Sequence, residues 1–252
     1  MIIFIVPYRD RENQKDFFYR HMTKHVLKEM KEEKDYKILF IHQNDKRPFN
    51  RGGMKNIGFL VVKKLYPKEW KEITLVFNDI DTMPFKENYL NYRVKEGEIK
   101  HFYGLNVALG GIVSVTGKDF EKINGFPNYW SWGGEDNLLE YRAKINKIKI
   151  NRDNFHKFFD KNILSIHHGE ERIISKRISN MVELDEVDGI KTISNLDYKI
   201  ENNMVNVNNF NSKYEVKLKE KELEPVNIGK IKPRLNLNPV SMTTIMKRSQ
   251  DY

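Results

Sequence analysis

Two adjacent acids, Glu135 and Asp136, follow a pair of glycines near the middle of the chain. The stretch around them, 125–138, reads GFPNYWSWGGEDNL and also contains Trp130 and Trp132. Indole rings offer flat apolar faces on which a sugar can stack, and a carboxylate beside them could take a proton from a bound hydroxyl. A turn before a helix has the same pattern, since an acid at the helix N-terminus interacts favourably with the helix dipole. Both interpretations stay open from this stretch alone.

A second pair of acids, Asp79 and Asp81, stands directly after the apolar run 73–77. Carboxylates so spaced can bind a hard or borderline divalent cation, and such a cation can bridge a diphosphate. Asp-x-Asp is also common in solvated loops, so its position after a buried strand is what favours metal binding. His167 and His168 follow the run 163–166, and imidazole suits Mn or Zn beside carboxylates.

The elements that must position these residues alternate between strand and helix. Continuous apolar runs predict strands and helically spaced apolar residues predict helices: strands at 2–6, 36–41, 73–77 and 112–115, and helices at 17–30, 54–65 and 136–147. This order predicts an α/β fold with a mostly parallel, Rossmann-like sheet flanked by helices. Ligands bind such sheets beyond the carboxyl ends of the strands, where this order places Arg9, Arg11, Arg51, Asp79 and Asp81.

Composition excludes some classes of protein. The 252 residues contain no Cys, so disulfides and thiolate metal sites are excluded. The formal charge of +9 is spread over scattered Lys residues rather than a dense basic block, which is weak support for a nucleic-acid partner. The first apolar run is too short for a membrane span or signal peptide, and we expect a cytoplasmic protein.

The chain is predicted to form one domain over 1–218, followed by an extension or tail over 219–252. Hydrophobic density falls in the extension, and three prolines interrupt it, which is typical of low order. A late strand is expected at 214–218, just before it.

Taken together, the motifs resemble the β-1,4-galactosyltransferase family, which are inverting nucleotide-sugar transferases with a GT-A fold. The matching residues, in order, are 6–11 (VPYRDR), 49–51 (FNR), 77–81 (FNDID), Gly110-Gly111, 124–136 (NGFPNYWSWGGED) and His168. They extend over roughly residues 1–200, and the run 124–136 is the most specific of them.

The resemblance implies a role for each matching residue. A UDP-sugar would be held by Pro7, Tyr8, Arg9, Arg11, Phe49, Arg51, Asp79, Ile80, Asp81, Ala108, Gly111 and Trp132. Mn²⁺ would be bound by Asp81 and His168, with His167 as a further candidate. Asp136 would be the general base, Glu135 would position donor and acceptor, and Trp132 would close over the donor. The acceptor, a glycan or glycoconjugate, would contact Trp130, Asp136, Asn137 and Ile178.

Three departures from the family pattern leave substrate and metal details open. Ser165 stands where the galactosyltransferases have a Met metal ligand, so His167 or water could take that place. Ala108-Leu109 replaces Tyr-Phe before the glycine pair, which leaves room beside the C2 substituent of the sugar and predicts tolerance for UDP-GalNAc or another bulkier donor. Asn137 replaces a further acid, which suggests a different acceptor.

The sequence therefore predicts a metal-dependent glycosyltransferase that moves galactose, N-acetylgalactosamine or a related sugar from UDP to a sugar hydroxyl. A non-catalytic sugar- or nucleotide-binding relative is the alternative. A basic nucleic-acid-binding protein is a third hypothesis, which the scattered Lys residues support only weakly. No nucleic-acid partner and no membrane span are expected, and the oligomeric state is left open.

Overall fold

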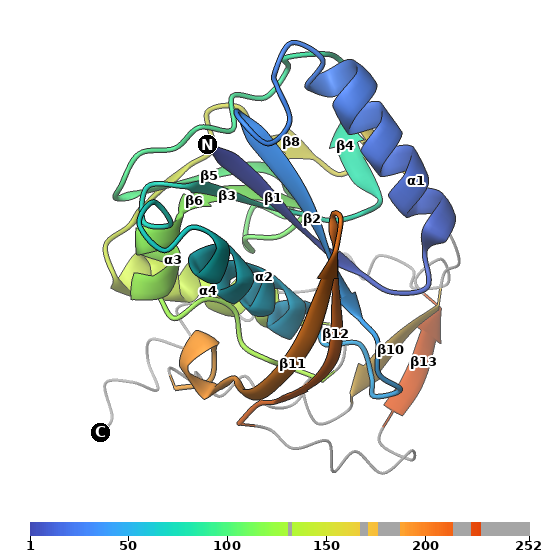
Figure 1. The fold of residues 1–252 in the computed structure, drawn as a ribbon. Helices are drawn as coiled ribbons and strands as arrows, with labels where there is room; N and C mark the ends of the chain where they lie inside the picture. The colour runs from blue at the N-terminus through green and yellow to red at the C-terminus, as the bar shows by residue number, and fades with distance from the viewer. Residues whose placement is uncertain (131–132, 167–170, 176–186, 214–222, 228–252) are drawn as a thin grey trace, which may run out of the picture.

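The computed structural model describes residues 1–130, 133–166, 171–175, 187–213 and 223–227 (Figure 1). The helical elements are α1 (Glu12–His21), the short π-helix η1 (Met22–Val26), α2 (Arg51–Leu65), α3 (Gly117–Lys122), α4 (Glu135–Ile145) and the 3-10 turn η2 (Ile190–Thr192). The strands are β1 (Ile2–Tyr8), β2 (Tyr36–Gln43), β3 (Thr74–Asn78), β4 (Thr82–Pro84), β5 (Glu98–Gly104), β6 (Ile112–Thr116), β7 (Lys149–Asn151), β8 (His156–Lys157), β9 (Ile163–Ser165), β10 (Glu171–Ser175), β11 (Ser194–Glu201), β12 (Met204–Asn211) and β13 (Leu223–Asn227).

A nine-stranded mixed sheet forms the centre of the described fold, in the order β11-β12-β2-β1-β3-β6-β5-β7 with β8 also paired to β5. β1 pairs in parallel with both β2 and β3, and β6 runs antiparallel to β3 and β5. Most of the pairings are parallel, as the strand and helix order predicts. The antiparallel β6 has its beginning at the edge where β3 ends, so it brings another loop to that edge.

The central strand β1 is buried on both faces, which explains why its sequence is an unbroken apolar run. Ile3 and Ile5 pack in the cluster that contains Met54 and Ile57 of α2, whereas Phe4 and Val6 pack in the cluster that contains Phe18 of α1. The alternation follows from the two-residue period of a strand. The two helices therefore cover opposite faces of the sheet (Figure 1).

Helix α2 begins at Arg51, three residues before the predicted start at 54. The side chain of Asn50 caps it by accepting a hydrogen bond of 2.7 Å from the backbone N–H of Gly53. Gly52 lies inside this helix rather than in a turn. A glycine is required there by close packing, because a Cβ would overlap the carbonyl oxygen of Pro127. The predicted helix start at 54 was therefore three residues too late.

The first helix is also displaced from its prediction at 17–30. It begins at Glu12 and passes at Met22 into the π-helix η1. Among the described residues, neither this helix nor any other is long and apolar enough to cross a membrane.

The hairpin of β11 and β12 was not predicted, although β12 extends the sheet by pairing in parallel with β2. Its two-residue loop is Asn202-Asn203, a composition that favours tight hairpin turns, and the alternation in 204–207 was the missed signal. β13 lies inside the predicted low-order extension and pairs antiparallel with β10, so this part of the extension has regular structure. The predicted strand at 214–218 lies outside the described residues.

Candidate active site

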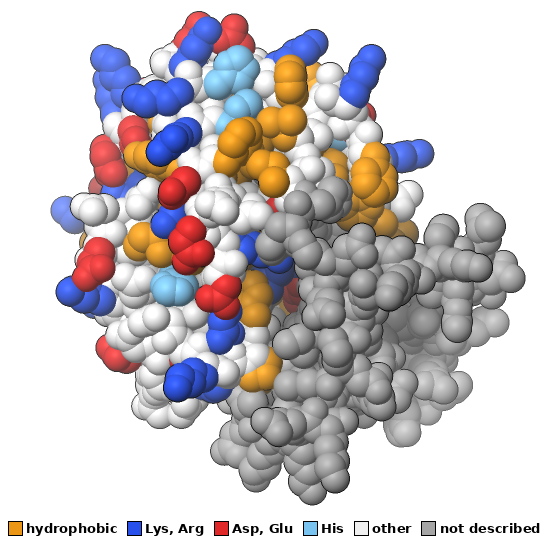
Figure 2. Space-filling view, turned by 90° about the vertical axis from the view of Figure 1, so that its right-hand side faces the viewer, with side chains coloured by type: hydrophobic (Ala, Val, Ile, Leu, Met, Phe, Trp, Pro, Cys, Tyr) orange, Lys and Arg blue, Asp and Glu red, His pale blue; other side chains and the backbone are white. Residues whose placement is uncertain are grey.

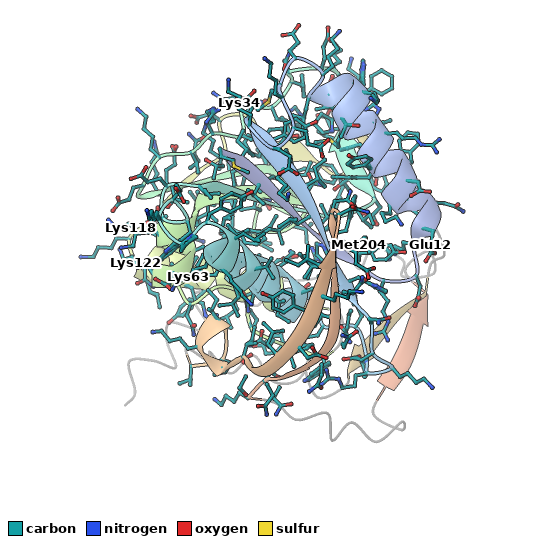
Figure 3. All side chains as sticks on the ribbon, in the orientation of Figure 1. Glu12, Lys34, Lys63, Lys118, Lys122 and Met204 are labelled. Carbon is teal, nitrogen blue, oxygen red and sulfur yellow. The ribbon has the colours of Figure 1, made fainter. Side chains whose placement is uncertain are left out.

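The carboxyl ends of β1, β2 and β3 meet at one edge of the sheet, as predicted for the rim arginines and acids. Glu12, labelled in Figure 3, lies at this edge just beyond the end of β1, whereas Lys34 marks the opposite edge before β2. Gly110-Gly111 reaches the same edge because it precedes the antiparallel β6, and the backbone N–H of Asp79 donates to the carbonyl of Gly111 at 3.0 Å. Figure 2 shows the side that carries α1, where basic, acidic and hydrophobic side chains of the described residues are all visible.

Arg51, the first residue of α2, connects three carboxylates at this rim. Its Nη2 donates to both oxygens of Asp79 at 2.8 Å. Its Nη1 donates to Asp136 Oδ2 at 2.9 Å and also to Glu135 Oε1. Burial alone would lower the pKa of Arg51, but the surrounding acids raise it well above the usual value, so the guanidinium is a fixed cation.

Asp136 lies in the first turn of α4 and has a cation on each carboxylate oxygen. Arg51 binds Oδ2, and Lys55 Nζ donates to Oδ1 at 3.2 Å. Burial opposes ionisation, but the charges and hydrogen bonds of Arg51 and Lys55 hold the pKa of Asp136 below its usual value. The side chain is 18% exposed, so Asp136 is a carboxylate within reach of a ligand at the rim.

Gly110 lets the backbone approach this carboxylate closely. A Cβ at Gly110 would overlap Asp136 Oδ2 and lie 2.8 Å from its Cγ. The neighbouring N–H of Leu109 donates to the carbonyl of Asp136 at 3.0 Å. The glycine pair before β6 and the acid pair that opens α4, 25 residues apart, are therefore in direct contact.

Glu135 is the buried member of the acid pair. Its Oε2 accepts a hydrogen bond of 3.2 Å from the backbone N–H of Gly133, and its other oxygen binds Arg51. Burial and the neighbouring charge of Asp136 raise the pKa of Glu135. The two adjacent acids thus differ: the pKa of Asp136 is lowered and that of Glu135 is raised, and the side chain of Glu135 is the more deeply buried of the two.

Asp81 lies beside Arg11, whose Nη1 is 3.1 Å from Asp81 Oδ2. Burial and the nearby charge of Asp79 raise the pKa of Asp81, against the opposite effect of Arg11 and Arg51. The backbone N–H of Ile166 donates to the carbonyl of Asp81 at 2.8 Å. The residue before His167 in the sequence therefore lies next to Asp81.

An oxygen ligand from Asp81 next to one or two imidazoles is a donor set that fits a borderline cation such as Mn²⁺. His167 and His168 themselves lie outside the described residues, as do Trp132 and Ile178. Within the described part of the chain, no three His, Asp or Glu side chains are grouped to hold a metal. Ser165 ends β9 opposite Thr82, which follows Asp81.

Other residues predicted to bind the UDP-sugar lie at the ends of β1, β2 and β3. Pro7 lies within β1 opposite Ile41, and Tyr8 donates to Glu12 at 2.7 Å. Arg9 donates to the carbonyls of Asp45 and Arg47 and so braces the loop that leads to Phe49. Ile80 is buried between the two acids of the Asp-x-Asp motif.

Trp130, a predicted acceptor contact, is buried against β12. Its indole is 4% exposed, stacks on Phe210 of β12 with 5.0 Å between ring centroids, and has the Arg47 guanidinium 4.4 Å from its centroid. Arg47 is also 4.8 Å from the ring centroid of Phe210, so these three side chains form one cluster, and acceptor contact by Trp130 stays a prediction. Asn137 is at the rim, where its side chain donates to the carbonyl of Val107 at 3.1 Å.

A buried polar network under the rim was missed by sequence reasoning. Asn56 of α2 donates to the carbonyl of Phe126 at 2.7 Å and to Asn128 Oδ1 at 2.9 Å, and accepts from the N–H of Phe126. Asn128 in turn donates through its backbone and side chain to buried Asp188, at 2.6 and 2.9 Å. Arg142 of α4 donates to the carbonyl of Gly125 at 2.7 Å. The network holds 124–128 rigidly beneath the site.

Lys55 was the other residue missed at the site. It follows Arg51 by four positions, so both side chains leave the same face of α2, and this spacing was the available signal.

The order of the sheet and the rim of acids and arginines define the class of protein as a GT-A glycosyltransferase fold. A similar fold occurs in the catalytic domain of Drosophila β1,4-galactosyltransferase 7: the TM-score is 0.67 with 21% identity, covering 88% of this chain and 96% of that one. A mutant of that protein, solved with manganese, UDP-Gal and xylobiose, matches equally well, at 20% identity.

Sequence comparisons specify the family. The model described as the N-terminal region of glycosyl transferase group 7 matches residues 1–94, and the one described as the N-terminal domain of galactosyltransferase matches 94–168. The chain belongs to the β-1,4-galactosyltransferase family.

Individual relatives match over part of their length. β-1,4-Galactosyltransferase 4 of Cricetulus griseus is 32% identical over 161 residues, which cover 60% of this chain and 44% of the relative. β-1,4-Galactosyltransferase 5 of Sus scrofa is 28% identical over 208 residues, 78% of this chain and 51% of the relative. The chain spans about half the length of the curated relatives it matches.

Proposed function

We propose that this protein is an inverting, metal-dependent glycosyltransferase that moves galactose or N-acetylgalactosamine from UDP to a sugar hydroxyl. The observation that carries the proposal is Asp136, an ionised carboxylate held at the ligand edge of the sheet by Arg51 and Lys55. Family membership supports the reaction class, and the manganese and UDP-Gal bound by the structural neighbour support the cofactor and the donor.

Arg11 and Arg51 are the groups that would bind the diphosphate of the donor. Both guanidinium groups lie beside the Asp79–Asp81 pair, and planar donors of this kind suit phosphate oxygens. A divalent cation held by Asp81 and the imidazoles at 167–168 would neutralise negative charge on the departing UDP.

Asp136 would act on the acceptor. Its carboxylate takes the proton of the acceptor hydroxyl while the hydroxyl oxygen forms a bond to the anomeric carbon on the face opposite the UDP. The bond from that carbon to the UDP oxygen breaks, UDP leaves with the electron pair, and the configuration at the carbon inverts. Glu135, buried behind Asp136 and bonded to Arg51, positions the reacting groups.

The choice between the two donors depends on Ala108. This residue lies in the loop between β5 and β6, where Leu109 is bonded to the backbone of Asp136. A small side chain there supports space for an N-acetyl group at C2, and both donors are therefore included in the proposal.

The test is a screen of UDP-sugars with Mn²⁺ that measures UDP release with and without simple sugar acceptors. UDP-Gal or UDP-GalNAc should be consumed only when Mn²⁺ and a suitable acceptor are present. Asp136→Asn should lower transfer by about 1,000-fold and leave UDP binding intact, and Asp81→Ala should abolish the Mn²⁺ dependence of UDP binding. Transfer retained by Asp136→Asn would remove this residue as the base, and unchanged Mn²⁺ dependence would remove Asp81 as the ligand.

A further inference from the structure

Lys55 is a buried lysine with a single carboxylate partner among the described ion pairs. Its side chain is 2% exposed, and its ammonium lies 3.2 Å from Asp136 Oδ1 and 4.3 Å from the ring centroid of Phe126. A lysine is rarely this buried unless its charge is paired. Asp136 is the group that pairs it.

Arg51 differs from Lys55 because it is shared. It binds Asp79, Glu135 and Asp136 at the same time, and the proposed function also gives it a diphosphate to bind. Three carboxylates thus face two cations, and a diphosphate would add further negative charge next to Arg51. Lys55 lies on the far side of Asp136, on the oxygen that Arg51 does not touch.

We propose that Lys55 is a positioning residue for the transfer reaction, which holds Asp136 in place as a carboxylate while Arg51 serves the other acids and the donor. The proposal rests on the proposed function, in which Asp136 is the base. Lys55 fixes the Oδ1 atom, and Arg51 binds the Oδ2 atom, which lies against Gly110.

The groups around Asp136 predict the direction of the effect. Arg51 and Lys55 come from α2, Glu135 from the same helix as Asp136, and Asp79 lies beyond Arg51 at the end of β3. His101 of β5 lies behind Gly110, and burial and Arg152 lower its pKa to about 4, so it adds no charge near neutral pH. Loss of Lys55 leaves Arg51 as the one described cation that binds Asp136 directly, so the base should protonate at higher pH.

The test is the pH profile of kcat/KM for Lys55→Met and Lys55→Gln with the donor and acceptor found in the screen. The acid limb should move up by at least about one pH unit, as expected when an opposite charge within hydrogen-bond reach is removed. At pH values well below the acid limb, kcat/KM of the Lys55 variants should be about tenfold lower than that of the wild type, while the Kd for UDP changes little. Lys63→Met on the same helix, whose lysine pairs with Glu121, is the matched control and should keep the wild-type profile. An acid limb unchanged in both Lys55 variants would overturn the proposal, whatever their stability.

A second measurement uses no substrate. In a thermal-unfolding cycle of Lys55→Met, Asp136→Asn and the double variant, the cost of losing Lys55 should be clearly smaller when Asp136 is already neutral. Additive effects would show that the pair does not interact and would also overturn the proposal. A wild-type protein that transfers no sugar would instead contradict the proposed function, and the cycle would still report on the pair.

Discussion

Arg51 donates to both oxygens of Asp79 at 2.8 Å while its other terminal nitrogen reaches Asp136 Oδ2 at 2.9 Å. One planar guanidinium thus connects the acid motif after β3 with the acid pair that opens α4. A lysine has the charge but not the fork of donors that this geometry requires.

Arg51→Lys should therefore lower kcat/KM by at least about 100-fold, the size of effect seen when a fixed donor to a reacting oxyanion is lost. Steady-state kinetics with saturating Mn²⁺ measures it. Arg20→Lys, at an exposed position of α1, is the control and should behave as the wild type. Activity within a few fold of the wild type would show that the fork is not used.

Gly110→Ala should damage catalysis more than folding. The added Cβ would overlap Asp136 Oδ2, and the carboxylate would have to move by a fraction of an ångström or more. Displacement of a reacting group on this scale can cost about 100-fold in rate. UDP binding and the circular dichroism spectrum should stay close to those of the wild type. An unaltered kcat/KM would contradict the close contact between Gly110 and Asp136.

Ala108→Tyr should narrow the donor range. Ala108 is 5% exposed and precedes the glycine pair, so a bulky ring there has to project into the space assigned to the C2 substituent. The ratio of kcat/KM for UDP-GalNAc to that for UDP-Gal should fall, and competition between the two donors measures it. Val107→Tyr, at a position that is 50% exposed, is the neighbouring control. A strict preference of the wild type for UDP-Gal would contradict the role of Ala108.

His101 should make stability depend on pH. Its Nδ1 accepts from Arg152 Nε at 3.0 Å, so its Nε2 carries the hydrogen and donates to the carbonyls of Tyr103 and Gly110. Burial and the charge of Arg152 lower the pKa of His101 from 6.5 to about 4. A second proton would face Arg152 directly.

Because the unfolded chain binds this proton at higher pH than the folded one, stability is complete above pH 6.5 and falls as the pH drops toward 4. The slope is at most about 1.4 kcal/mol per pH unit, which amounts to about 3 kcal/mol over this window. Chemical denaturation across pH 4–8 measures it, and His101→Asn should remove this part of the slope while leaving the curves parallel above pH 7. Identical slopes for the two proteins would contradict the neutral, buried assignment.

Much of the site could be predicted from short stretches of sequence. Apolar runs identified the central strands because both faces of β1 are buried, and the order of strands and helices then placed Arg51 and Asp79 at one edge. The helix starts were less predictable. Glycine usually indicates a turn, but Gly52 lies within α2, where a larger residue would overlap the carbonyl oxygen of Pro127. That carbonyl is 75 residues away in the sequence.

What the sequence by itself determined is the family, the parallel core and the set of acids and arginines at the strand ends, because these depend on local patterns and on the order of elements. The tertiary structure decided how those groups are shared. It turned Trp130 inward onto Phe210, set Asn56 against the carbonyl of Phe126, and placed the ammonium of Lys55 on Asp136. Each of these contacts joins segments more than 60 residues apart, and which distant partner a side chain meets depends on how the elements pack.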